Sequence, residues 1–329
     1  MRRRDFIKGI AGSAAAWPLA ARAQQGERSR HIGILMALAE DDPGSKPRIT
    51  MFLQRLEQLN WTVDHNVQID IRWGAADAAQ ARKGAAELVA LAPDVILAPA
   101  SAGTAALREA THTVPIVFVA VIDPVGAGYV ASLAKPGGNI TGFAYVEYGM
   151  SGKWLELLKE VAPGVTRAAI LRDPALPTGT GQFGAIQSAA PSFGIEISPI
   201  DVRDLAGIER AIADFARTPN GGVIVTAWPA ALPNRNVIVA MIAEHRLPAV
   251  YFNSAFVRVG GLISYGADAI AEYGQAASYV DRILKGEKPA DLPVQTPTKF
   301  EMVINLKTAK DLGFTVPSAL LARADEVME

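Results

Sequence analysis

Short stretches of small and polar residues follow several apolar segments of the chain, and a bound molecule would meet them first. The apolar run 94–98 is followed by PASAGT over 99–104. Ser101 is placed to cap a helix there, and a small side chain such as Ala102 leaves backbone N–H groups open to a carboxylate or another anion. The pattern therefore predicts that Ser101 and Ala102 contact a ligand.

A second stretch of this kind is DPVG over 123–126, which follows the apolar run 116–121. Aspartate is a preferred N-cap, and proline is favoured at the first helical position, so a helix is predicted to begin at Asp123. The Asp123 carboxylate could either cap that helix or contact a ligand. Asp123 is accordingly a candidate ligand contact.

The second half of the chain places further polar and aromatic side chains just after apolar runs. The candidates there are Thr178, Trp228, Asn253 and Tyr265. We expect Trp228 to form a stacking surface, because burying one such ring contributes about 4–6 kcal/mol at the upper bound. Micromolar binding requires about 8 kcal/mol, so an aromatic wall with a few backbone donors would suffice.

Patterns typical of catalysis and metal binding are missing from the sequence. There is no cysteine, and the four histidines are too scattered to suggest a metal pair. No G-x-G-x-x-G follows the first predicted strand, where Gly33 stands alone, and G-x-S-x-G does not occur. The one fragment similar to a phosphate loop has Glu147 where the loop requires glycine. The sequence predicts a protein that is not an enzyme and that uses no cofactor and no metal ion.

The distribution of charge argues against a nucleic-acid partner. The formal net charge is −1, and the body of the chain contains no block rich in lysine and arginine. Nucleic-acid-binding proteins usually carry such a basic stripe. We therefore expect a small-molecule ligand.

The first 23 residues have the pattern of a secretory signal peptide. Basic residues 2–4 precede an apolar run over 10–21, and Ala21-Arg22-Ala23 supplies the cleavage pattern. The run is too short to span a bilayer, and RRDFIK over 3–8 is similar to the twin-arginine export motif. Export by the general secretory route stays open. Cleavage would remove five positive charges and one negative, which leaves a soluble mature chain near −5, without membrane insertion.

The elements that must position these candidates alternate along the chain. Apolar runs at 32–35, 94–98 and 116–121 are typical of strands covered on both faces, as in parallel sheets. Apolar and polar residues alternate over 67–73, which predicts a strand at the edge of a sheet. Helical segments are expected at 78–92 and 104–110. This β-α-β-α order predicts a doubly wound α/β domain.

The same rhythm begins again after about residue 142. Strands are expected at 168–171, 195–200, 223–226, 249–252 and 262–265, with helices near 182–193, 205–217 and 234–245. A last helix carries Ile270, Tyr273, Ala277, Val280 and Leu284 in one stripe. The chain is thus predicted to form two similar α/β units. Ligands of such open sheets bind beyond the carboxyl ends of the strands.

Several longer motifs resemble those of one protein family. They are DPVGAG at 123–128, SLAKPGGNITG at 132–142, GGLISYG at 260–266, YVDRILKGEKPADLP at 279–293 and PTKFEMVINLKTA at 297–309. Together they resemble the substrate-binding proteins of ABC transporters related to the tryptophan/tyrosine-binding type. The resemblance covers essentially the whole chain after the signal peptide. One departure is Val121-Ile122 before Asp123, where a glycine is common, so the identity of the ligand is not carried over.

The resemblance implies the fold of a type I periplasmic binding protein, in which two Rossmann-like lobes are joined by a three-segment hinge. Residues 31–142 with 266–295 would form the first lobe, and 143–265 with 296–329 the second. The ligand would lie between them. In this reading the 297–309 motif packs at the hinge rather than against the ligand.

The resemblance also implies a function and its partners. The protein would be a periplasmic, soluble and monomeric receptor that closes around a small organic solute, amino-acid-like or a carboxylate. It would deliver this solute to an inner-membrane ABC permease and its ATPase. Two alternatives stay open, a ligand-sensing module that serves a periplasmic receptor and an exported α/β enzyme.

Overall fold

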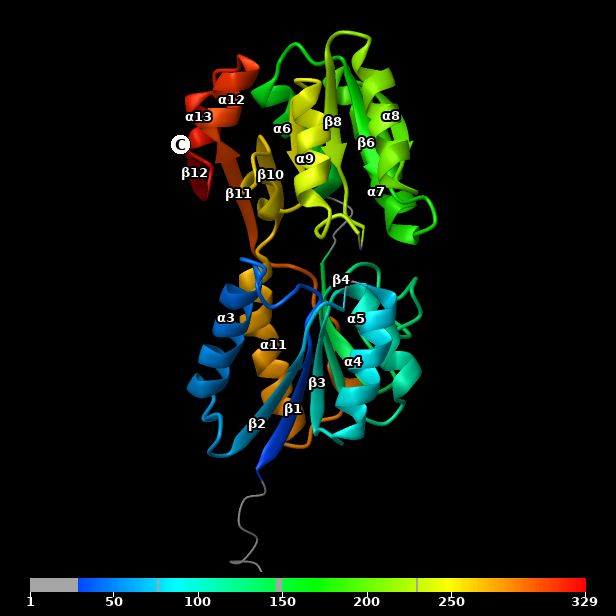
Figure 1. Cartoon of the computed structure of the whole chain (residues 1–329), viewed down its shortest axis with the longest axis vertical. Helices are drawn as coiled ribbons and strands as arrows, with labels where there is room; N and C mark the ends of the chain where they lie inside the picture. The colour runs from blue at the N-terminus through cyan, green and yellow to red at the C-terminus, as the bar shows by residue number, and fades with distance from the viewer. Residues whose placement is uncertain (1–28, 76, 146–149, 229) are drawn as a thin grey trace, which may run out of the picture.

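The computed structural model describes residues 29–75, 77–145, 150–228 and 230–329, with the side chains of residues 177 and 178 left out. The predicted signal peptide, residues 1–23, lies outside this part. Two α/β lobes follow one another along the longest axis of the molecule (Figure 1). The predicted fold class is confirmed.

The first lobe contains a parallel sheet of five strands in the order β2-β1-β3-β4-β5. Its elements are β1 (Arg30–Leu35), α3 (Ser45–Gln58), β2 (Val67–Arg72), α4 (Ala78–Ala90), β3 (Val95–Pro99), α5 (Ala100–Ala110), β4 (Ile116–Val121) and β5 (Ile140–Ala144). The alternating strand β2 lies at the edge, as its pattern predicts. The fully apolar β3 is buried along its whole length.

The second lobe contains a sheet of seven strands in the order β12-β11-β10-β9-β8-β6-β7. The elements up to β10 are α6 (Ser151–Val161), β6 (Arg167–Arg172), α7 (Pro177–Phe193), β7 (Glu196–Asp201), α8 (Leu205–Ala216), β8 (Gly221–Val225), α9 (Arg235–Glu244), β9 (Ala249–Tyr251), α10 (Ser254–Val257) and β10 (Ile263–Ala267). After β10, α11 (Ala269–Leu284) and a 3-10 turn (Pro289–Asp291) belong to the first lobe. The chain then adds β11 (Phe300–Asn305), α12 (Leu306–Leu312), α13 (Ser318–Leu321) and β12 (Glu326–Met328) to the second lobe.

The chain passes three times between the two sheets. It leaves the first sheet after β5, and it returns after β10 to form α11, which packs against α3 and the first sheet. The third passage leads from the first lobe to β11, and Gln295 holds it there. The Gln295 backbone N–H donates to Gly142 O at 3.0 Å, and Gln295 O accepts from Ala144 N at 2.8 Å. These passages form the predicted three-segment hinge.

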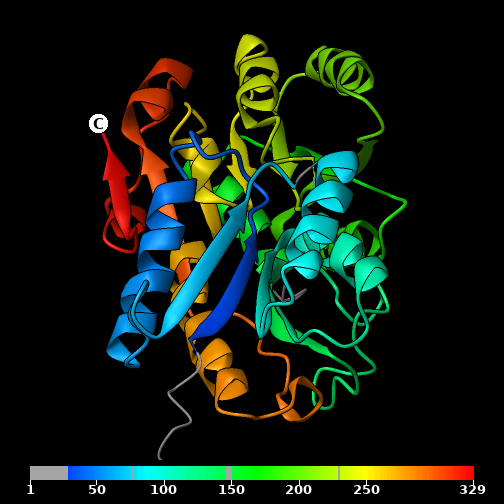
Figure 2. The same cartoon turned by 60° about the horizontal axis from the view of Figure 1, so that its bottom comes forward.

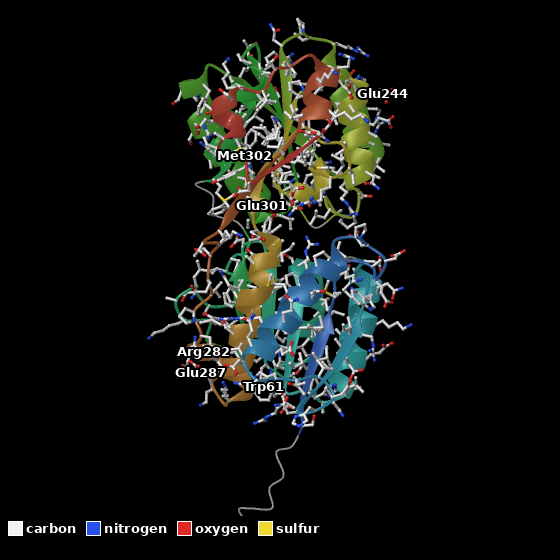
Figure 3. The ribbon with its side chains drawn as sticks, turned by 90° about the vertical axis from the view of Figure 1, so that its left-hand side faces the viewer. Trp61, Glu244, Arg282, Glu287, Glu301 and Met302 are labelled. Carbon is white, nitrogen blue, oxygen red and sulfur yellow. The ribbon has the colours of Figure 1, made fainter. Side chains whose placement is uncertain are left out.

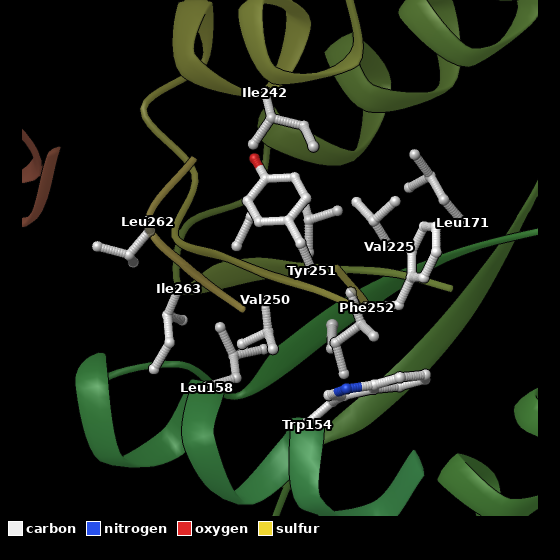
Figure 4. Packing of buried hydrophobic residues seen from close by; sticks show 14 of the residues in the cluster. Trp154, Leu158, Leu171, Val225, Ile242, Val250, Tyr251, Phe252, Leu262 and Ile263 are labelled. Carbon is white, nitrogen blue, oxygen red and sulfur yellow. The ribbon is translucent and has the colours of Figure 1, made fainter. Parts of the chain in front are cut away.

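Each lobe has its own hydrophobic core. In the first lobe, helices α3 and α11 cover one face of the sheet and α4 and α5 the other (Figure 2). In the second lobe the core gathers around β8, β9 and α6, where Tyr251, Phe252 and Trp154 pack with aliphatic side chains (Figure 4). The predicted stripe of α11 is buried at Tyr273, Ala277, Val280 and Leu284, whereas Ile270 is 38% exposed.

Two local predictions about helix starts are wrong. Helix α5 begins at Ala100 directly after Pro99, so Ser101 lies inside its first turn and does not cap it. Proline holds the extended backbone that a residue before a helix needs, and the helix therefore starts earlier than expected.

No helix follows Asp123; the described chain between β4 and β5 is built from turns. Asp123 has a left-handed backbone with φ of 47°, and its Oδ1 accepts a hydrogen bond from Gly126 N at 2.8 Å. This local bond closes a turn in place of a helix.

The tail of the chain adds strands that the pattern did not predict. The 297–309 motif contains β11, which pairs antiparallel with β10, and β12 extends the sheet at its edge. Among the described residues, no helix combines the length and the apolar character needed to cross a membrane.

Candidate ligand-binding site between the two lobes

A small cavity of about 80 Å³ lies where the two lobes meet. In the first lobe, the ends of β1, β3 and β4 line it through residues 37–38, 99–100, 102 and 120. The second lobe contributes Leu232, Pro233 and Asn253, and the rings of Tyr145 and Tyr273 complete the wall. We call this space the inner cavity; its wall is mostly apolar and partly aromatic.

A larger cavity of about 420 Å³, the outer cavity, shares Leu38, Arg48, Leu232, Asn253 and Ala269 with the inner one. Its volume lies in the range of small-molecule sites. It is much more polar, because five charged side chains line it. They are Asp42, Arg48, Arg235, Arg258 and Glu301.

Three of these five charges are already neutralised by ion pairs. Arg235 of α9 reaches across to Asp42 of the first lobe, with Nη2 and Oδ2 2.8 Å apart. Arg258 makes two hydrogen bonds of 2.8 and 2.7 Å to Glu326, outside the cavity. In the part of the chain that the structure describes, Arg48 and Glu301 form no ion pair.

Two alanines hold a strained backbone beside the inner cavity. Ala100 has φ of 65° and Ala120 has φ of 55°, in the left-handed region that residues other than glycine rarely adopt. Ala120 lies at an irregularity in the pairing of β4 with β5. Such strain persists where the surrounding structure enforces it, and it concentrates at functional sites.

Tyr145 is fixed in place by the second lobe. Its hydroxyl donates to Phe252 O at 3.2 Å and accepts from Asn253 Nδ2 at 2.8 Å. Asn253 Oδ1 in turn caps α10 by accepting from Ala255 N. Burial raises the pKa of Tyr145, so its hydroxyl stays neutral. The Tyr145 ring is thus one aromatic wall of the inner cavity, and hydrogen bonds to Phe252 and Asn253 fix its position.

Two of the predicted site residues line these cavities. Ala102 borders the inner cavity, and Asn253 borders both. Ser101 and Asp123 serve the neighbouring turns instead. The Ser101 hydroxyl accepts from Ile122 N at 3.4 Å, and the Asp123 carboxylate is bonded to Gly126 N.

The aromatic candidates lie elsewhere in the second lobe. The sequence position of Trp228 predicts a stacking surface for a ligand, but the side chain is only 5% exposed and belongs to the core of that lobe. Burial of its apolar ring in that core is favourable. Tyr265 stacks on Phe300 with ring centroids 5.8 Å apart and lines neither cavity. Thr178 lies in α7, and its side chain is outside the described part.

The sequence patterns missed most of the residues that line the cavities. Arg48 lies within α3, Tyr145 at the end of β5, Tyr273 within α11 and Glu301 at the start of β11. These segments lie far apart in the sequence, and they meet because the chain passes three times between the two lobes. A signal existed for Tyr273, which was predicted to lie on the apolar face of its helix. No group of three or more histidine, aspartate or glutamate side chains in the described ranges is arranged to hold a metal ion.

A wide groove of about 660 Å³ lies on the first lobe alone. Its wall is formed by residues 40–43 before α3, by α3 as far as Gln54, and by Ile270 of α11. Because one lobe forms it, a molecule bound there would not contact the second lobe. The inner and outer cavities are therefore the candidate sites, because a ligand there would contact both lobes.

Glu272 is a buried carboxyl group near the hinge. It is 4% exposed, and neither oxygen has a hydrogen-bond partner among the described residues. Burial raises the pKa of Glu272 well above the usual value of 4.5; the charge of Asp268 raises it further, and Arg48 opposes this. The folded protein therefore holds a proton that the unfolded chain releases.

We predict that Glu272→Gln stabilises the protein, and that the gain grows with pH. Above the ordinary carboxyl pKa, the wild-type free energy of unfolding falls by up to about 1.4 kcal/mol per pH unit, until the raised pKa is passed. Glutamine has no proton to lose. Denaturant unfolding at pH 5 and pH 8 measures the effect, with exposed Glu209→Gln as control. An equal difference between variant and wild type at both pH values would contradict the assignment.

Comparison with known proteins places this architecture in a known group. A family model described as ABC transporter substrate binding protein matches residues 41–328. A tyrosine-binding protein of Clostridioides difficile is 26% identical over 300 residues, which are 89% of this chain and 84% of the relative.

Two solved structures share the fold over 91% of this chain and the whole of theirs. One is an ABC domain from Streptococcus pneumonia in complex with L-Trp, with a TM-score of 0.82 at 25% identity. The other is a conserved domain protein from Vibrio cholerae, with a TM-score of 0.81 at 26% identity. The resemblance predicted from the motifs is confirmed. Because the family model covers nearly all of the described fold, the chain belongs to the ABC transporter substrate-binding protein family.

Proposed function

We propose that this protein is the periplasmic receptor of an ABC importer and that it takes an aromatic amino acid between its lobes. The cavities support this proposal most directly. An apolar, partly aromatic inner cavity continues into a charged outer cavity, and both lobes line each of them. The tyrosine-binding relative and the tryptophan complex are consistent with such a ligand.

The arrangement suits a molecule with an apolar side chain and a carboxylate. The side chain would enter between Tyr145 and Tyr273, beside the strand ends that carry Ala100 and Ala102. The carboxylate would meet Arg48, which borders both cavities. A charge-assisted hydrogen bond of this kind is roughly twice as strong as a neutral one. Asn253, which borders both cavities, would orient the ligand between the two groups.

In this proposal the ligand shifts a conformational equilibrium. Residues 31–142 with 266–295 form one lobe and residues 143–265 with 296–329 the other. A ligand that contacts both lobes binds the closed form more tightly, and so it increases the closed population. The monomeric receptor would then present its cargo to the permease, whose ATPase supplies the energy. The N-terminal segment would direct export by the twin-arginine route.

A thermal-shift screen of the mature protein tests the proposed ligand. L-tryptophan and L-tyrosine should raise the melting temperature in a saturable way, whereas L-lysine and D-ribose should not. A ligand at 100 times its Kd stabilises the folded state by about 2.7 kcal/mol. Each hit should be recovered unchanged after incubation, because a receptor releases its cargo intact. A lack of stabilisation by every aromatic amino acid would contradict the proposal, and steady consumption of a hit would indicate an enzyme.

A further inference from the structure

The outer cavity contains two charges of opposite sign that have no ion-pair partner among the described residues. Arg48 extends from α3 of the first lobe, and Glu301 from β11 of the second. Figure 3 shows Glu301 on the part of the second lobe that is turned toward the first. Every other charged side chain that borders this cavity is held in an ion pair.

Glu301 is oriented by a neighbour from its own lobe. Ser254 Oγ donates to Glu301 Oε1 at 2.5 Å, and Ser254 also borders the outer cavity. Oε2 makes no hydrogen bond within the described residues. The carboxylate is therefore fixed by one oxygen while the second remains available.

Arg48 is held in a comparable way in the first lobe. Its Nη1 donates to the backbone oxygen of Gly44 at 2.5 Å, and its remaining guanidinium N–H groups, which bond to no other described residue, can serve a ligand. A half-buried charge without a partner is costly unless a ligand supplies the opposite charge. A ligand with one positive and one negative group would satisfy both side chains at once.

We propose that Arg48 and Glu301 recognise the two charges of a zwitterion, and that Glu301 selects ligands with a free amino group. Arg48 receives the carboxylate, and Glu301 with Ser254 receives the ammonium group. Since the two side chains belong to different lobes, the zwitterion connects the lobes through its own charges. This inference rests on the proposed function, because it assigns a polar end to the ligand of the same site.

If Glu301 binds the ammonium group, an amino acid should bind more tightly than the same molecule without its amino group. Indole-3-propionate keeps the ring and the carboxylate of L-tryptophan but lacks the ammonium group. It would leave Glu301 buried and unpartnered in the closed form. A site built to bind a polar group rejects the analogue that lacks it. Wild-type protein should therefore bind L-tryptophan at least tenfold more tightly than indole-3-propionate.

Isothermal titration of both compounds against Glu301→Gln tests this assignment. Affinity for L-tryptophan should fall about tenfold to a hundredfold, whereas affinity for indole-3-propionate should stay within about threefold of wild type. Ser254→Ala, which only frees the carboxylate, should show a smaller loss in the same direction. Glu244→Gln, far from the cavity on the same lobe (Figure 3), serves as control and should bind both compounds as wild type does.

Three results would decide against the inference. If Glu301→Gln lost equal affinity for both compounds, Glu301 would have only a structural role. If wild-type protein bound both equally, the site would not read the amino group. Both results leave the proposed function in place. If no aromatic amino acid or des-amino analogue bound to the wild type, the proposed function would fail together with this inference.

Discussion

Arg48→Met should weaken the binding of an aromatic amino acid by about two orders of magnitude while leaving the fold intact. Arg48 borders both the inner and the outer cavity, and within the described chain it has no carboxylate partner. Hydrogen bonds to charged groups contribute about 1.5–3 kcal/mol, and a buried ligand carboxylate left unpaired adds its own penalty. Methionine keeps most of the apolar stem, so packing along α3 should change little.

Calorimetry with L-tryptophan measures the loss, and circular dichroism checks the fold. Arg55→Met is a matched control, because Arg55 lies on the same helix but pairs with Gln58 at the surface. The control should bind as wild type does. An Arg48→Met protein with unchanged affinity would mean that the carboxylate lies elsewhere in the cleft.

Asp42→Asn should lower the affinity for the same ligand about a hundredfold, because it destabilises the closed arrangement of the lobes. The ion pair between Asp42 and Arg235 joins the lobes, and its two side chains are only 16% and 15% exposed. Each partner is also anchored, Asp42 by Gly44 N and Arg235 by Leu232 O. Removing one partner of a buried pair costs about 3–5 kcal/mol, because the other charge stays buried. When the lobes open, that charge returns to water, so the open form becomes more stable relative to the closed form.

A charge exchange separates this effect from loss of a ligand contact. Arg235→Gln should act like Asp42→Asn, and the exchange Asp42→Arg with Arg235→Asp should recover part of the affinity. Arg217→Gln removes an exposed pair within the second lobe, 81% and 69% exposed, and should change nothing measurable. Wild-type affinity in both single variants would show that the pair does not hold the lobes together.

Most of the fold could be predicted because it depends on local patterns. Continuous apolar runs identified β3 and β4 as buried strands, and strict alternation placed β2 at an edge. The tail was harder, since β11 pairs with β10 only after the chain has passed through the first lobe as α11. For residues 297–309 the prediction was packing at the hinge, and the antiparallel strand β11 was not predicted.

The site was only partly predictable, for a geometric reason. The rule that ligands bind at strand ends correctly selected Ala102 and Asn253 as residues lining the cavities. It could not select Arg48, Tyr273 or Glu301, which reach the cavity from helices and from the returning strand. Trp228 also follows a strand end, but its ring turns into the core, and the sequence position alone does not reveal this direction.

Ligand binding is expected to close the two lobes, and one distance between the lobes tests this most directly. The chain has no cysteine, so Lys83→Cys on α4 and Glu209→Cys on α8 introduce a single dye site in each lobe. These helices lie on the same side of the molecule (Figure 1). Single-molecule energy transfer should show that saturating L-tryptophan shifts the population toward the shorter distance. Bound ligand with an unchanged distance distribution would contradict the account.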